Sequence, residues 1–165
     1  MKKTTVIGVL VAVAVAAFGA FKYAESKKQA RESQVERGRY LVTIGGCNDC
    51  HTPGYGLSGG KVDEALWLTG DSLGWQGPWG TTYAINLRNY VQALTEEQWV
   101  QIVAKMQSRP PMPYFNLQRM KEEDLRAMYQ YIRAAGPAGA ETPPYLPPGV
   151  EATTPVVVFP APPPA

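Results

Sequence analysis

The pattern of hydrophobic and polar positions divides the chain into three parts. An apolar run follows two lysines at the N-terminus and extends from Val6 to Phe21. A body of helical patterns and glycine-rich stretches comes next, followed by a tail that is rich in proline. We therefore expect a membrane anchor or signal segment over residues 1–24, one domain over 25–136 and an extended tail over 137–165.

The N-terminal run is typical of an export signal or a membrane anchor, because a basic start precedes the apolar stretch. Counted from Thr4 to Ala24, with Lys22 reaching toward the headgroups, it approaches the roughly 20 residues of a membrane span. The small residues that a cleavage site requires fit only weakly. We expect an uncleaved anchor over residues 4–24 that holds the body on the periplasmic side of the inner membrane. Cleavage stays open, and it would give a soluble periplasmic protein.

Three stretches of the body show helical periodicity. The first covers residues 28–44 and stops at a pair of glycines. The second begins with a capping box, in which Thr95 is the N-cap and Gln98 stands three positions later. The third covers residues 121–135 and closes at Gly136. No strand pattern competes, so the body is expected to be all-α.

Residues 52–93 lack a sustained period and are rich in glycine and aromatic residues. We expect a long ordered loop region there, which is unusual in a small domain unless it is functional or wraps a bound group. The proline-rich tail is expected to be extended. The sequence leaves open whether the tail is disordered or whether residues 156–159 lie along the body.

Charge and cysteine content narrow the classes of function. The formal net charge is +2, and no Lys and Arg run is interleaved with aromatic residues, so we expect no nucleic-acid partner. The two cysteines, three positions apart, are too few for a disulfide scaffold. The single histidine directly follows the second cysteine, and this pairing is the most informative feature of the chain.

The sequence Cys-Asn-Asp-Cys-His at residues 47–51 is the attachment signature of c-type haem. Two thiols on one turn of chain can each bond a vinyl group at the same edge of a porphyrin. The imidazole of the next residue then lies under the iron. We therefore expect one covalent haem c, with its iron, attached through Cys47 and Cys50 and ligated by His51.

Three other uses of these residues are weaker hypotheses. Structural zinc takes four ligands, and the chain has only three Cys and His residues. A thioredoxin-like pair lies in a βαβ pattern, and no strand is expected before Cys47. A disulfide between Cys47 and Cys50 would close a very small loop and contribute little stability. Export also favours haem, because thiols outside the cytoplasm tend to oxidise.

Met112 is the expected second axial ligand of the iron. One histidine excludes bis-histidine ligation within the chain, and a methionine thioether is a soft ligand that raises the reduction potential. Met106 and Met128 lie on apolar helix faces, where methionine is usually core, and Met120 precedes the last helix. Met112 differs because it stands between two prolines that restrict its backbone. The alternative is a hydrophobic residue in a proline-rich turn.

With these motifs the sequence resembles the class I (monohaem) cytochrome c family of bacterial type. The resemblance implies an all-α class I cytochrome c fold, in which helices and long loops wrap around one covalently attached haem. It also implies that the first body helix crosses the last, with Gly38 allowing close approach to Met128 and Tyr131. The matching segments are residues 37–41, 47–53, 111–115 and 124–132, within about 35–136.

The segment over residues 77–87 is similar to one in bacterial members of that family, where aromatic and Asn groups flank the haem and its propionates. The resemblance therefore implies haem contacts by Trp79, Tyr83 and Asn86. A structural loop would look similar.

A haem iron with two strong protein ligands suits an electron carrier rather than an enzyme, because no position is left open for a substrate. We expect a one-electron carrier between exported redox partners of a bacterial respiratory or dehydrogenase chain. Its donor would be a dehydrogenase, and its acceptor an oxidase or another cytochrome. The alternative is a haem-based gas sensor or haem enzyme with an open sixth iron position. A structural metal module without haem is a third, weaker hypothesis.

Overall fold

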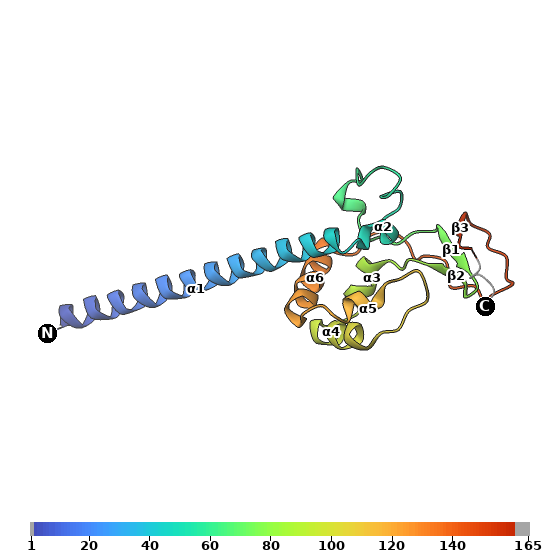
Figure 1. Ribbon diagram of the computed structural model, residues 1–165. Helices are drawn as coiled ribbons and strands as arrows, with labels where there is room; N and C mark the ends of the chain where they lie inside the picture. Colours follow the sequence, from blue (N-terminus) through green and yellow to red (C-terminus); the bar gives the residue numbers. More distant parts are fainter. Residues whose placement is uncertain (1, 161–165) are drawn as a thin grey trace. The chain divides into compact units, whose positions relative to one another are not determined.

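The computed structural model describes the backbone of residues 2–160 and the side chains of residues 15–160 (Figure 1). The chain divides into two compact units, residues 1–34 and 35–165. The helices are α1 (Lys2–Ile44), α2 (Cys47–His51), the 3-10 turn η1 (Glu64–Leu66), α3 (Leu87–Gln92), α4 (Glu96–Lys105), α5 (Tyr114–Leu117) and α6 (Glu122–Ala135). The strands are β1 (Gly74–Gly77), β2 (Gly80–Tyr83) and β3 (Val156–Val158).

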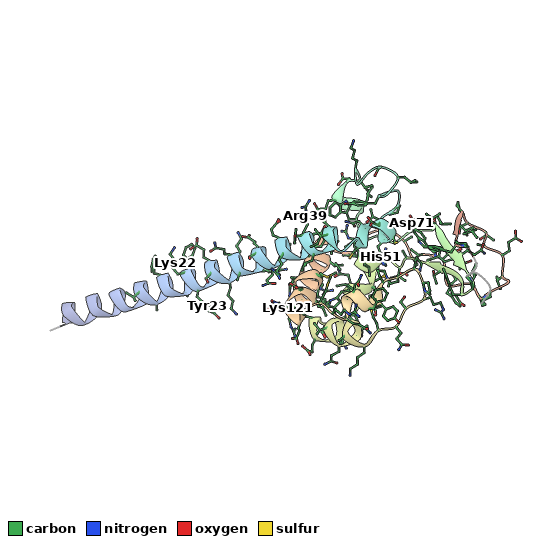
Figure 2. The ribbon with its side chains drawn as sticks, viewed as in Figure 1. Lys22, Tyr23, Arg39, His51, Asp71 and Lys121 are labelled. Carbon is green, nitrogen blue, oxygen red and sulfur yellow. The ribbon has the colours of Figure 1, made fainter. Side chains whose placement is uncertain are left out.

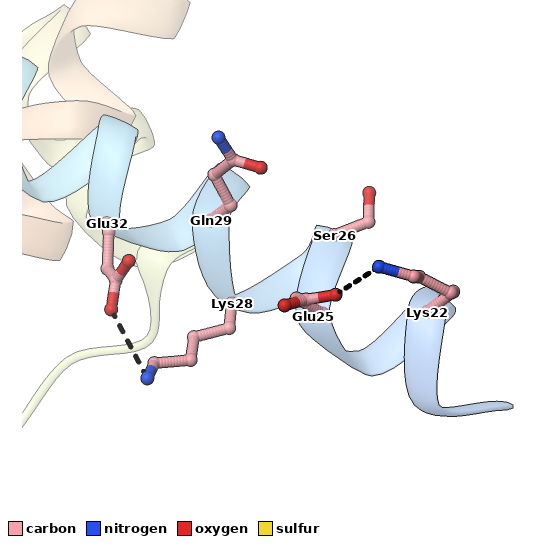
Figure 3. Close-up of a pocket in the computed structure, with 6 residues that line it drawn as sticks. All are labelled: Lys22, Glu25, Ser26, Lys28, Gln29 and Glu32. Carbon is pink, nitrogen blue, oxygen red and sulfur yellow. Dashed lines mark hydrogen bonds and ion pairs between the residues drawn. The ribbon is translucent and has the colours of Figure 1, made fainter. Parts of the chain in front are cut away.

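In the first unit, the described side chains of α1 are exposed to solvent. Lys22 and Glu25 form an ion pair of 3.0 Å, and Lys28 and Glu32 form one of 3.8 Å, each about one turn apart (Figure 3). Exposed pairs at this spacing contribute about 0.3–0.5 kcal/mol each to helix stability. We expected this helix to begin at residue 28, but α1 begins at Lys2. It begins earlier because no proline interrupts the chain before residue 28.

The apolar part of α1 bears on the expected membrane anchor. Within the residues that the structure describes, there is no helix with both the length and the apolar character to cross a membrane. Much of the apolar run at residues 6–21 lies outside the described side chains. The anchor over residues 4–24, the division at 1–24, 25–136 and 137–165, and the periplasmic location stay predictions.

The core of the second unit forms where α3 and α4 pack against α6. Thr95 caps α4 with the expected capping box. Its side chain accepts from the Gln98 backbone N–H, and the Gln98 side chain accepts from the Thr95 backbone N–H. Trp99 on α4 donates its indole hydrogen to the Leu125 carbonyl at 2.9 Å, which joins α4 to α6. The largest wholly buried apolar side chains are Val42, Leu68, Val91, Val103 and Ile132.

The C-terminal end of α1 crosses α6 at Gly38. A Cβ atom added there would overlap the Ala127 backbone oxygen and lie 2.7 Å from the Tyr131 Cβ atom. The expected close approach at Gly38 is therefore confirmed for Tyr131. The second partner is Ala127 rather than Met128, because the atoms nearest to a Cβ at Gly38 are the Ala127 carbonyl and the Tyr131 Cβ atom.

The expectation of a body without strands was wrong in detail. Strands β1 and β2 form an antiparallel hairpin, and β3 from the tail adds to β1 in parallel. The strands are only three or four residues long, so no period-2 pattern could mark them. Residues 52–93, expected as loop, also hold α3, which Asn86 caps by accepting from the Asn89 backbone. Helices still predominate, and the mainly α fold class is confirmed.

Candidate haem-binding site

The single turn of α2 presents the whole Cys-Asn-Asp-Cys-His motif. It begins after Gly46, whose φ of 67° lies in the left-handed region that glycine adopts at little cost. This left-handed residue interrupts the helix between α1 and α2, so the motif starts a new helical turn rather than continuing the old one. The two cysteines therefore share one turn, as attachment to one porphyrin edge requires.

The C-terminal side of α2 is fixed by hydrogen bonds to residues 68–70. Thr52 donates its hydroxyl to the Asn48 side chain at 2.7 Å and accepts from the Leu68 backbone at 2.8 Å. The Gly70 backbone donates to the His51 carbonyl at 2.8 Å. Leu68 is buried with a φ of 61°, a conformation that costs a non-glycine residue about 1–3 kcal/mol. The surrounding packing holds this strained residue, and with it the motif.

His51 lies at the end of α2 in the body of the second unit (Figure 2). Its ring is buried, with 7% of its surface exposed, and its Nδ1 lies 2.8 Å from the Ile85 carbonyl oxygen. A carbonyl can only accept, so Nδ1 carries the hydrogen and Nε2 keeps its lone pair. Burial lowers the pKa of His51, and the Ile85 hydrogen bond opposes this shift only in part. The ring is thus neutral and oriented to bind a metal through Nε2.

The two thiols lie in surroundings that disfavour a thiolate. Burial raises the pKa of the Cys47 thiol to about 11, and Asp49 adds to the effect. Burial also raises the pKa of Cys50, with contributions from Asp49 and Asp71. A reactive cysteine needs a lowered pKa, whereas a thioether sulfur carries no charge at all. The sulfur environment therefore fits covalent attachment to a porphyrin.

The zinc and thioredoxin-like hypotheses find no support in the described residues. Among them, no three His, Cys, Asp or Glu side chains are grouped so as to hold a metal ion. Helix α1, not a strand, leads into Cys47. Neither four-ligand zinc nor a βαβ redox pair matches this arrangement.

Met112 is half-buried in the non-helical segment between α4 and α5, as expected. Met106, Met120 and Met128 all belong to the hydrophobic core or pack against it. Within the described residues, Met112 is not part of that core packing. Its thioether is therefore the one among these four methionines that the core does not already use.

The hairpin connects the supports of the two candidate iron ligands. Thr82 donates its hydroxyl to the Pro110 carbonyl at 2.7 Å, two residues before Met112. Three residues after Thr82, the Ile85 carbonyl holds the His51 ring. An extended chain covers about 10 Å in three residues. Residues 82–85, at the end of β2 and just after it, thus contact both His51 and the segment at residues 106–113 that contains Met112, which we call the methionine segment.

The three residues expected to flank the haem each have a partner within the chain. Trp79 donates to the Trp75 carbonyl at 3.3 Å, and the Tyr83 hydroxyl pairs with that of Thr154 at 3.0 Å. The Asn86 amide donates to the Ala138 and Ala140 carbonyls of the tail at 2.7 and 3.1 Å. Their polar groups are occupied in this way, and haem contacts by Trp79, Tyr83 and Asn86 stay predictions.

Trp75 was not identified from the sequence. Its Nε1 atom is buried and has no hydrogen-bond partner among the described residues. The same holds for Nδ2 of Asn48 within the motif and for Nε2 of Gln92 at the end of α3. Buried donors without a partner are rare in folded proteins, and each needs an acceptor such as a bound group or a water molecule. A haem carboxylate is an acceptor that an indole N–H can satisfy. The shared turn of the two cysteines, the neutral thiols and the oriented imidazole together fit a haem, and Trp75 is a candidate donor to its carboxylate.

Comparison with known proteins identifies the family. The family model described as "Cytochrome c" matches residues 35–136. The chain is 26% identical over 121 residues to a subunit of nicotinate dehydrogenase from Pseudomonas putida, and the match covers 67% of this chain and 9% of that protein. The chain thus spans about a tenth of that relative's length. No solved structure matches the chain. The chain belongs to the cytochrome c family, with a class I fold, covalently bound haem c and a role in haem-based electron transfer.

Proposed function

We propose that this protein is a one-electron carrier whose haem is held by four residues of the second unit. Cys47 and Cys50 form the thioethers, His51 is the proximal ligand and Met112 the distal one. The observation that carries the proposal is the 2.8 Å contact between His51 Nδ1 and the Ile85 carbonyl, which leaves Nε2 for the iron. The bound haem supplies a reversible ferric–ferrous couple.

The surroundings of the ligands favour electron transfer over catalysis. With His51 and Met112 both bound, the iron would have no position for a substrate or a gas. His51 is buried and fixed by its hydrogen bond, and the Met112 segment is tied to the hairpin through Pro110. Ligands held in this way move little when the charge on the iron changes. Little movement favours rapid electron exchange.

We place the donor among dehydrogenases and the acceptor among oxidases or other cytochromes. The similarity to a subunit of nicotinate dehydrogenase supports a dehydrogenase chain as the setting. The basic and apolar N-terminus supports a periplasmic location, with a membrane anchor if it is retained. N-terminal sequencing of the purified protein tests the anchor, since a start near residue 20–25 would remove it.

The distal ligand is tested with two volume-conserving variants, Met112→Leu and Met106→Leu. Met112→Leu should lose the long-wavelength Met–iron absorption, lower the reduction potential and bind carbon monoxide rapidly when reduced. Met106→Leu should keep the wild-type spectrum, because Met106 packs against the core. An unchanged spectrum in Met112→Leu would discard Met112 as a ligand. Rapid carbon monoxide binding by the wild type would favour the gas-sensor alternative.

The thioethers are tested by the mass of the denatured protein. The wild type should retain one haem through denaturation and acid extraction. Cys47→Ser and Cys50→Ser should each retain it through one bond only, which shifts the haemochrome absorption. A Cys50→Ser spectrum identical to the wild type would show that Cys50 carries no haem.

A further inference from the structure

Residues 137–160 of the proline-rich tail are an ordered part of the second unit. We call residues 137–160 the strap. It is extended, as the sequence suggests, but it is bonded along its length to the hairpin and to α3. Strand β3 pairs with β1, and the Phe159 backbone donates to the Gln76 carbonyl at 2.8 Å. The Phe159 ring packs on Trp79, with ring centroids 5.4 Å apart.

Two glycines of the body make room for the strap. Gly80 has a φ of 96°, and a Cβ atom there would overlap the Leu146 carbonyl oxygen. Gly70 has a φ of 78°, and a Cβ atom there would overlap the Thr142 side chain. Glycine is thus needed for both the backbone angle and the close approach. The body is shaped to take the strap.

The middle of the strap is fixed to the hairpin next to the methionine segment. Thr81 and Leu146 exchange two backbone hydrogen bonds of 2.8 and 2.9 Å. Tyr145 donates its hydroxyl to the Trp79 carbonyl at 2.8 Å. These bonds fix the plane of the half-buried Tyr145 ring, so the ring can act as a platform for another side chain.

That side chain is Arg109. Its guanidinium carbon lies 3.7 Å from the centre of the Tyr145 ring, which places the cation directly on the ring face. Arg109 precedes Met112 by three residues, and Pro110 beside it is held by the Thr82 hydroxyl at 2.7 Å. The methionine segment is therefore fastened at two adjacent residues, once by the strap and once by the hairpin that the strap covers.

We propose that the strap is a positioning element for the distal ligand, in which Tyr145 fixes Arg109 and so holds the Met112 thioether on the iron. This inference rests on the proposed function, because it takes Met112 as the ligand. Tyr145 contacts neither the haem nor its iron in this role. It acts by limiting how far the methionine segment can move away.

The test compares Tyr145→Leu with Thr153→Ala in the full-length haem protein. Tyr145→Leu removes the ring without changing the net charge, so electrostatics cannot account for a change in reduction potential. Thr153 is an exposed strap residue with no side-chain bond among the described contacts, which makes its variant a matched control. The readouts are the Met–iron absorption, the reduction potential and the rate of carbon monoxide binding to the reduced protein.

Tyr145→Leu removes one cation–π contact and one hydrogen bond, so the population with Met112 off the iron should rise roughly tenfold. Carbon monoxide binding should accelerate by the same factor, and the potential should fall. Tyr145→Phe, which keeps the ring, should restore most of the wild-type behaviour. Arg109→Leu should reproduce the effect from the other side of the contact, and the double variant should add little to Tyr145→Leu.

The outcomes separate this inference from the proposed function. A wild type that shows the Met–iron band, with Tyr145→Leu indistinguishable from Thr153→Ala, overturns the strap's role and leaves Met112 as the ligand. A wild type without the band overturns Met112 itself, and the strap's role with it. Should Tyr145→Leu fail to fold, Arg109→Leu decides, because its exposed side chain has no other partner among the described contacts. A wild-type rate in Arg109→Leu then overturns the inference.

Discussion

Replacing Trp75 with phenylalanine tests whether the Trp75 indole donates a hydrogen bond to the haem. The free energy of unfolding should fall if it does and rise if it does not. The indole Nε1 of Trp75 is buried without a partner among the described residues. If a haem carboxylate accepts its hydrogen, Trp75→Phe loses a hydrogen bond to a charged group, worth about 1.5–3 kcal/mol. If nothing accepts it, the variant removes an unsatisfied donor and gains about 1–3 kcal/mol.

The smaller ring complicates this comparison, because phenylalanine buries less surface than tryptophan. Trp79→Phe serves as the control. The Trp79 indole N–H already donates to the Trp75 carbonyl at 3.3 Å and so would not bond a haem carboxylate, and the rings of both tryptophans pack on Phe159. That variant loses the same ring area and one neutral hydrogen bond of about 1 kcal/mol. The difference between the two variants therefore isolates the partner of the Trp75 donor.

Urea unfolding of the haem protein, followed by far-ultraviolet circular dichroism, gives the free energies. A loss of about 2 kcal/mol lowers the midpoint by roughly 1 M urea for a domain of this size. The reduction potential should also fall, because a carboxylate without its donor stabilises the ferric iron. A Trp75→Phe protein more stable than Trp79→Phe, at an unchanged potential, would refute the assignment of Trp75 to the haem.

Three further predictions follow from the second unit. Gly38→Ala should lower the free energy of unfolding by about 1–3 kcal/mol in urea titrations, because its Cβ atom would overlap Ala127. Arg88→Leu should cost about 3 kcal/mol in the same assay, since the buried guanidinium donates to three backbone carbonyls. Burial and the hydrogen bond to Glu64 raise the pKa of Tyr131, so the folded state favours its protonated form. Its contribution to stability is present below about pH 10 and is lost at higher pH, by up to about 1.4 kcal/mol per pH unit. Tyr131→Phe should flatten that alkaline decline in unfolding curves measured above pH 10, and an equally steep decline would contradict the assignment.

Features that depend on neighbouring residues could be predicted from the sequence. The capping box of Thr95 needs only Gln98 three positions on, and α6 ends at Gly136 because its φ of 71° suits glycine. The haem motif is equally local, since five consecutive residues carry all its donors except the distal one. Each of these predictions rests on chemistry within one or two helical turns.

Features that depend on residues far apart in the chain could not be predicted from the sequence. Strand β3 pairs with β1 across about eighty residues of chain, and its three valines alone do not indicate which edge they will join. Helix α3 has six residues, too few for a helical period to show. Trp75 carries no local sign of its unpartnered donor, because that depends on everything packed around it. The bonds of the Asn86 amide to the tail depend on equally distant residues, and its expected contact with the haem stays a prediction.

The stretch at residues 82–86, from the end of β2 to the start of α3, explains why these distant contacts matter for electron transfer. Thr82 holds the methionine segment at Pro110, and Ile85 orients His51. Asn86 joins the same stretch to the strap. Two axial ligands supported by separate flexible loops would shift independently whenever the charge on the iron changed. Support from one short, bonded segment makes their positions depend on each other, so a shift of one ligand is opposed by the bonds of the other. In the proposed ligation by His51 and Met112, the strap adds to this restraint from the outside, and the iron site gains a stiffness that its small core alone would not provide.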